Sequence, residues 1–134
     1  MKSASTLIRV ALLVFTTPLL GGCGNRETGP IKAGGRDVAA WVADLDHRDP
    51  HVRRQAVLKL GNILDADPAV APALAGALGD RDPIVRRDAI FAVVKLKSPS
   101  PTILDQLSRI AESDRDPKLR DIAARALEKL KTQH

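Results

Sequence analysis

A motif that begins Arg-Asp-Pro occurs three times in this sequence and constrains its fold more than any other feature. The copies are Arg48–Ala56, Arg81–Ala89 and Arg115–Ala123, and their Asp-Pro pairs are spaced 33 and 34 residues apart. A fixed period of this length is typical of stacked repeats, in which each unit buries its apolar face against its neighbours. The sequence therefore predicts an all-α chain built from three similar units.

Each Asp-Pro pair is expected to begin a helix. An aspartate before the first turn can accept a hydrogen bond from a backbone N–H that has no intrahelical partner. Proline fits the first helical position because its missing N–H is not needed there. These roles fall to Asp49 and Pro50, Asp82 and Pro83, and Asp116 and Pro117.

Apolar residues recur at helical spacing after each pair, so the second helix of every unit is predicted to be amphipathic. Another apolar helical segment precedes each motif, at residues 38–45, 71–78 and 103–111. The unit is therefore helix A, a short turn, and helix B. The predicted core positions of the three B helices are Val52, Ala56, Leu60 and Ile63, then Val85, Ala89, Val93 and Leu96, then Leu119, Ala123, Leu127 and Leu130.

The motif resembles the HEAT-like repeats, in particular the short bacterial form named after the PBS lyases. The middle copy matches best, through residues 71–74 and 77–78 in helix A and residues 80–89 in the turn and helix B. The third copy has one extra residue in its A–B turn, and the first has no proline at the start of its helix A. The resemblance implies a short α-solenoid over residues 37–134, with repeats at about 37–66, 67–98 and 99–134.

The same resemblance implies a structural role for an arginine near the start of each helix B. In HEAT-like families the matching arginine usually bonds an aspartate in the turn of a neighbouring repeat. An anion site at these arginines is the alternative. The arginines are Arg53, Arg86 and Arg120, and the candidate partners are Asp46, Asp80 and Asp114.

Residues 1–22 are predicted to be a secretory signal, because Lys2 and Arg9 give it a positive start and its apolar run is too short to remain as a membrane span. Residues 20–23, Leu-Gly-Gly-Cys, resemble the bacterial lipobox. This implies cleavage between Gly22 and Cys23 and acylation of Cys23, with palmitate among the expected chains. Cys23 is the only cysteine and cannot form an internal disulfide. The alternative is an ordinary cleaved signal followed by an incidental cysteine.

Residues 24–36 are rich in glycine and polar residues and are predicted to form a flexible tether without regular structure. With an r.m.s. length of about 20 Å, such a tether would hold the domain close to a membrane. Gly24 stands where the inner-membrane retention signal of lipoproteins has Asp. The resemblance therefore implies the bacterial cell envelope, and within it the outer membrane on its periplasmic side.

Trp41 lies in a first helix that is apolar on most sides, although the outer face of a terminal repeat is expected to be polar. We favour the interpretation that Ile31 or another part of the tether covers Trp41. The alternative is a docking face through which the chain self-associates. Asp37 is the expected cap of this helix.

No pattern in the sequence predicts catalysis, a cofactor or a bound metal. His47, Asp49 and His51 lie close together, but Asp49 is expected to cap a helix and no fourth ligand is near, so two solvated histidines are the preferred interpretation. The net charge is +5, of which Lys2 and Arg9 contribute two. The remaining excess is too small and too dispersed for a nucleic-acid binder.

The face of helix B opposite the core stripe is predicted to form one row across the stacked repeats. Leu58 and Phe91 would be neighbouring apolar groups in this row, rimmed by basic side chains, and aromatic and arginine residues are frequent anchors of interfaces. The plainer interpretation, which we prefer for Phe91, is that its ring fills a gap between helices. The row consists of Arg54, Leu58 and Asn62, then Arg87, Phe91 and Lys95, then Asp121, Arg125 and Lys129.

These patterns predict a membrane-anchored, non-enzymatic lipoprotein that binds or scaffolds a protein partner of unknown identity. The alternative is a lyase-type enzyme or an accessory subunit related to the bilin lyases, although no residue here carries that activity over. A purely structural envelope component is a third hypothesis.

Overall fold

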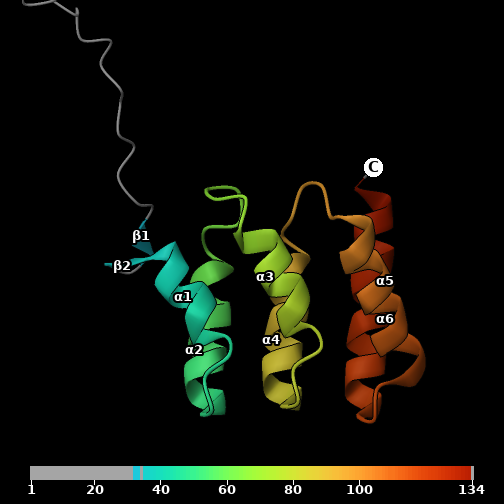
Figure 1. Cartoon of the computed structure of the whole chain (residues 1–134). Coiled ribbons are helices and arrows are strands. Elements are labelled where there is room, and N and C mark those ends of the chain that lie inside the picture. Colours follow the sequence, from blue (N-terminus) through green and yellow to red (C-terminus); the bar gives the residue numbers. More distant parts are fainter. Residues whose placement is uncertain (1–31, 34, 134) are drawn as a thin grey trace, which may run out of the picture.

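The computed structural model describes residues 32–33 and 35–133. Six helices follow one another in this part of the chain and form three pairs that stand side by side (Figure 1). The prediction of an all-α fold made of two-helix units is confirmed. The helices are α1 (Val38–Asp44), α2 (Pro50–Leu60), α3 (Val70–Ala77), α4 (Pro83–Val93), α5 (Pro101–Ser113) and α6 (Pro117–Thr132).

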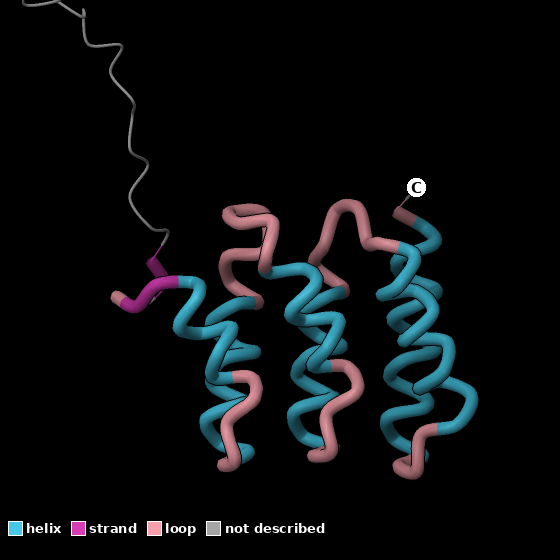
Figure 2. The backbone as a smooth tube through the Cα atoms, viewed as in Figure 1, coloured by secondary structure: helices cyan, strands magenta, loops and turns pink. Residues whose placement is uncertain are grey.

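The pairs build two layers of helices. Helices α2, α4 and α6 pack against one another in chain order, and α1, α3 and α5 do the same in the other layer. The turns within the pairs lie at one end of the stack, and the connections between pairs lie at the other (Figure 2). Equivalent positions of neighbouring pairs therefore lie side by side, as the repeated sequence requires.

The core follows the predicted apolar stripes. Nine of the twelve predicted positions are buried, and Val52, Ile63 and Leu127 are partly buried. Val57 in α2 and Ile90 in α4 are also fully buried, and each directly follows a predicted core alanine, Ala56 or Ala89. The buried face is thus wider than the stripe, because each helix B packs against its own helix A and against the helix B of the next pair.

The aspartates before α2, α4 and α6 cap these helices where the sequence places them. In α4 the Asp82 Oδ1 atom accepts hydrogen bonds from the backbone N–H of Ile84 at 2.8 Å and of Val85 at 3.3 Å. Asp49 and Asp116 each accept one bond from the N–H two residues further on, at 2.8 and 2.9 Å. These bonds satisfy donors of the first turn that no helical carbonyl can reach.

The starts of two A helices differ in detail from the prediction. Helix α3 begins at Val70, one residue before the predicted segment 71–78, so Pro72 lies inside its first turn. Proline is tolerated there because the N–H groups of the first turn have no intrahelical acceptor. Asp37 precedes α1 as expected, but its side chain makes no capping bond.

The end of the predicted tether is also different. Part of the predicted tether, residues 32–33 and 35–36, belongs instead to a short antiparallel hairpin of β1 (Lys32–Ala33) and β2 (Arg36–Asp37). Gly35 in its turn has a φ of 83°, a conformation that residues with a Cβ rarely adopt. The hairpin brings Arg36 back onto α1.

Arg36 covers Trp41. The guanidinium carbon of Arg36 lies 4.4 Å from the centre of the Trp41 ring, and its Nη1 atom donates a hydrogen bond to Asp44 Oδ2 at 2.7 Å. A guanidinium stacked on an indole at this distance makes a favourable cation–π contact. The favoured interpretation, that the segment before α1 covers Trp41, is confirmed, and Trp41 is buried.

The predicted signal, Gly22, Cys23 and the first part of the tether lie outside the described residues. Within residues 32–33 and 35–133 no helix combines the length and the apolar character needed to cross a bilayer.

Candidate functional site

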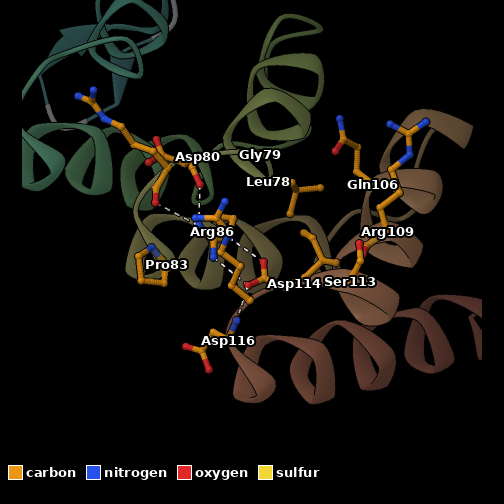
Figure 3. A pocket seen from close by; sticks show the side chains of 13 residues that line it. Leu78, Gly79, Asp80, Pro83, Arg86, Gln106, Arg109, Ser113, Asp114 and Asp116 are labelled. Carbon is orange, nitrogen blue, oxygen red and sulfur yellow. Dashed lines mark hydrogen bonds and ion pairs between the residues drawn. The ribbon is translucent and has the colours of Figure 1, made fainter.

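Arginine–aspartate pairs join consecutive repeats. Arg53 donates two hydrogen bonds to Asp80, from Nε to Oδ2 at 2.7 Å and from Nη2 to Oδ1 at 2.9 Å. Arg86 binds Asp114 in the same way, at 2.8 and 2.9 Å (Figure 3). Bidentate pairs of this kind are strong and directional. Both pairs lie where the HEAT-like resemblance places them.

The aspartates of these pairs titrate below their ordinary range. Burial on its own would raise the pKa of the Asp80 carboxyl, but hydrogen bonds from Arg53 and from the backbone N–H of Asp82 outweigh it, so the pKa is lowered. The pKa of Asp114 is lowered for the same reasons, against burial and by hydrogen bonds from Arg86 and the Asp116 N–H. Both carboxylates therefore stay ionised well into the acidic range.

The pairing stops at both ends of the stack. The prediction that Asp46 is the partner in the first turn is wrong. The position that matches Asp80 is occupied by His47, whose Nδ1 atom accepts a hydrogen bond from the backbone N–H of Asp49 at 3.0 Å. No repeat with an arginine precedes this turn in the described part of the chain. At the other end, Arg120 donates from Nη1 to the Asp114 carbonyl at 2.7 Å and has no carboxylate partner among the described residues.

The second pair lines a hollow of about 710 Å³ between the turn before α4 and helix α5. Figure 3 shows Asp80 and Pro83 on one side of it, Gln106 and Arg109 on the other, and the Arg86–Asp114 pair between them. In the described part of the chain no buried side-chain nitrogen or oxygen lacks a hydrogen-bond partner. The buried charges of this hollow are therefore satisfied by the contacts that join the repeats.

A second hollow, of about 330 Å³, lies between α2 and α4, on the face opposite the core stripe. Leu58 and Phe91 line it and are 48 % and 52 % exposed. The preferred interpretation that Phe91 fills a gap between helices is therefore wrong. Ile90 and Ala92, the residues on either side of Phe91, are buried and occupy the interior in its place.

Small residues form the lining where the two helices come closest. A Cβ atom added to Gly61 would lie 2.9 Å from the Ala92 Cβ and 3.1 Å from the Val57 carbonyl oxygen. The first distance is shorter than real Cβ contacts and the second is tighter than most of them, so a side chain at position 61 would force its neighbours to shift. Leu58 of α2 and Phe91 of α4 line the hollow beside this contact.

A buried carboxylate connects the two repeats beside this hollow. Asp88 is only 6 % exposed and accepts from Arg54 Nε at 2.6 Å and from Arg87 Nε and Nη2 at 3.1 and 3.0 Å. The side chains of Arg54 and Arg87 are 43 % and 39 % exposed. One carboxylate thus orients two arginines from consecutive repeats and leaves one positive charge uncompensated.

Four of the nine residues of the predicted row line one hollow. Leu58, Asn62, Phe91 and Lys95 line it together with Asp88. Arg125, Lys129 and Asp121 are exposed on α6 but do not line it. Asp88 is the residue of this hollow that the sequence analysis did not single out. Its only signal was an aspartate at a position where the other repeats have Gln55 and Ile122.

A family profile described as HEAT repeats matches residues 38–133, which is most of the chain. The chain belongs to the HEAT-repeat family. The predicted resemblance is confirmed over the whole helical region. No curated protein matches the chain significantly.

The last HEAT repeat has a polar outer face. The positions of Val57 and Ile90, which are fully buried in the first two repeats, are taken in the third by Ala124, which is exposed. Arg125 and Glu128 follow on the same side of α6, and both are exposed. A polar outer face is typical of a terminal repeat in a solenoid.

The histidines of the first turn do not gather ligands for a metal. The His47 Nδ1 atom is engaged by the Asp49 N–H, and His51 is exposed at the start of α2. Across the part of this HEAT domain that the structure describes, no group of three or more His, Cys, Asp or Glu side chains is placed to hold a metal ion.

Proposed function

We propose that this HEAT-repeat chain is a membrane-anchored, non-enzymatic lipoprotein that binds or scaffolds a protein partner through the hollow between α2 and α4. The HEAT-repeat fold supports the general part, because stacked helical repeats present extended surfaces for binding. The observation that carries the specific part is the pair Leu58 and Phe91, each about half exposed on the same hollow.

Single apolar residues on a surface need no explanation, and Ile84, which is exposed away from this hollow, is one of them. Leu58 and Phe91 differ because they face one concavity with arginines beside it. Aromatic residues, phenylalanine among them, and arginine are enriched in protein interfaces, and arginine is also frequent among the residues that contribute most binding energy. The hollow is therefore better suited to a protein partner than any other described surface.

The membrane anchor is proposed on residues 20–23 alone. A lipobox cysteine carries its acyl chains close to the start of the mature chain, and two or more chains hold a protein stably, whereas one is marginal. The tether would then place the helical stack near the periplasmic side of the outer membrane. Self-association through α1 is a weaker part of the proposal, because Arg36 already covers Trp41.

The substitution Cys23→Ser tests the anchor. We expect it to abolish acylation and cleavage, because the serine hydroxyl does not replace the thiol in thioether formation. The intact mass of the native protein, compared with that of the variant, gives the answer. A native protein without acyl chains would contradict this part of the proposal and leave the binding surface untouched.

The substitution Phe91→Ala tests the surface in the full-length protein, by capture of partners from solubilised envelopes and their identification by mass spectrometry. We expect the captured partner to be lost while the free energy of unfolding changes by no more than about 0.5 kcal/mol, as is usual for an exposed residue. Ile84→Ala is the matched control, because it removes an equally exposed apolar side chain elsewhere on α4. A partner that Phe91→Ala and Leu58→Ala both leave bound would contradict the proposed surface.

A further inference from the structure

Positively charged side chains lie at both ends of the hollow between α2 and α4. Arg54 and Arg87 are held by Asp88, which itself lines the hollow, and Lys95 contributes an exposed ammonium group to the lining. Lys95 makes no ion pair with any described residue. Between these cations Leu58 and Phe91 form the exposed apolar walls, and Asn62 adds one polar side chain to the lining.

The two arginines are oriented in advance but not saturated. Arg54 uses only Nε to bind Asp88, and Arg87 uses Nε and Nη2. The remaining terminal amino groups of both have no partner among the described residues. A guanidinium already fixed by one carboxylate loses less side-chain entropy when it binds a second anionic group, and its planar fork matches carboxylates as well as phosphates.

The hollow is small. Its volume of about 330 Å³ is near the lower limit of pockets that enclose drug-sized molecules, roughly 300–1,000 Å³. It has room for one large side chain, and the rest of an occupant would lie over the rim, where the cations are.

From these observations we infer the chemistry of the partner: an acidic segment of a protein that inserts one large apolar side chain between Leu58 and Phe91. Carboxylates on one side of that side chain meet Arg54 and Arg87, and a carboxylate on the other side meets Lys95. The inference rests on the proposed function and adds to it the charge and the anchor of the partner. One partner segment would then contact both the cations at the rim and the exposed apolar side chains of the hollow.

A membrane surface is the other negatively charged occupant to consider, and the shape of the hollow disfavours it. A flat bilayer cannot fill a concavity between two helices. The carboxylate of Asp88 in its lining would also face the anionic headgroups. A peptide chain can place a side chain in the hollow and keep its carboxylates at the rim.

The test is a selection of random displayed peptides on the full-length protein in detergent, followed by affinity measurements on the selected peptides. We expect aspartate and glutamate to be enriched around a single aromatic or aliphatic residue. Lys95→Glu should weaken binding roughly three- to tenfold, as reversal of one partly exposed charge predicts. Lys97→Glu, which changes the same charge two residues away and outside the hollow, should leave binding unchanged. Binding should also weaken as salt is added.

The outcomes separate the inference from the proposed function. Peptides that need Phe91 but show no acidic enrichment, and that Lys95→Glu does not weaken, overturn the acidic partner and leave the binding surface standing. Peptides that bind equally well to Phe91→Ala overturn both. A third arm mixes the protein, anchored in phosphatidylcholine vesicles, with separate phosphatidylglycerol vesicles. Clustering that Phe91→Ala and Lys95→Glu abolish would assign the face to anionic lipid and overturn the acidic segment.

Discussion

Gly61 shows how one residue without a side chain shapes the candidate site. It directly follows α2, and a Cβ there would lie 2.9 Å from the Ala92 Cβ of α4, which is too short for a real contact, and 3.1 Å from the Val57 carbonyl oxygen. Its φ of −63° is ordinary helical backbone, so space and not conformation is what requires glycine. The hollow beside it exists because the helices can approach so closely.

We expect Gly61→Ala to lower the free energy of unfolding by about 1–3 kcal/mol, the usual cost of overpacking a tight contact. Gly76→Ala is the matched control, because nothing lies within 4 Å of the Cβ that it adds. In a helix interior that change should stabilise by about 0.5–1 kcal/mol. Urea unfolding of the two variants measures both effects, and equal stability of the two would contradict the close contact.

At the scale of the element, each helix B begins with the same local device. Asp-Pro supplies a capping carboxylate and a residue whose backbone is already close to helical. The device depends only on residues within one turn, so it works alike in α2, α4 and α6. Helix α1 lacks it, since Asp37 has the right position but makes no capping bond.

This difference makes a paired prediction. Asp82→Ala should cost about 1 kcal/mol of stability, because two N–H groups of α4 lose their acceptor. Asp37→Ala should change stability by no more than about 0.5 kcal/mol, since it removes an exposed carboxylate without a capping bond. Thermal unfolding followed by circular dichroism compares the two. A cost for Asp37→Ala as large as that for Asp82→Ala would show that capping is not the reason.

At the scale of the whole molecule, buried charge pairs hold the repeats in register. Arg53 with Asp80 and Arg86 with Asp114 connect residues 27 and 28 positions apart, each joining the start of one helix B to the turn of the next repeat. Removing one partner of such a pair leaves a charge without compensation in a site that water barely reaches. The pairs therefore fix how each repeat sits on its neighbour.

Because of these pairs, we expect the folded protein to lose stability in acid. The pKa of Asp80 and of Asp114 is lower in the folded protein than in the unfolded chain, where an aspartate titrates near 3.9. Their contribution is fully present above the unfolded pKa and is lost as the pH falls from about 4 through the folded pKa values. Melting temperatures measured between neutral pH and pH 2 should fall in that window. Asp114→Asn should be less stable at neutral pH and should lose less on acidification, whereas an equal loss in both proteins would contradict this assignment.

The sequence by itself determined those features of the fold that depend on residues close together in the chain. The Asp-Pro starts, the apolar stripes and the period of 33 and 34 residues are local signals, and they suffice to predict three helix pairs in the right order. The family resemblance added the positions of Arg53 and Arg86. The choice of Asp46 in the first turn was an error of register, because Asp80 and Asp114 each lie two residues before the capping aspartate and His47 holds that position before Asp49.

The tertiary structure decided the features that arise between repeats. Phe91 is exposed because Ile90 and Ala92 already fill the interior around it. Asp88 meets Arg54 across 34 residues of sequence, a contact that no local spacing predicts. Such contacts depend on how closely two helices approach, and here that distance is set by the missing side chain of Gly61 against Ala92. A periodic sequence specifies which faces meet, whereas the packing of individual side chains decides what remains on the surface to bind a partner.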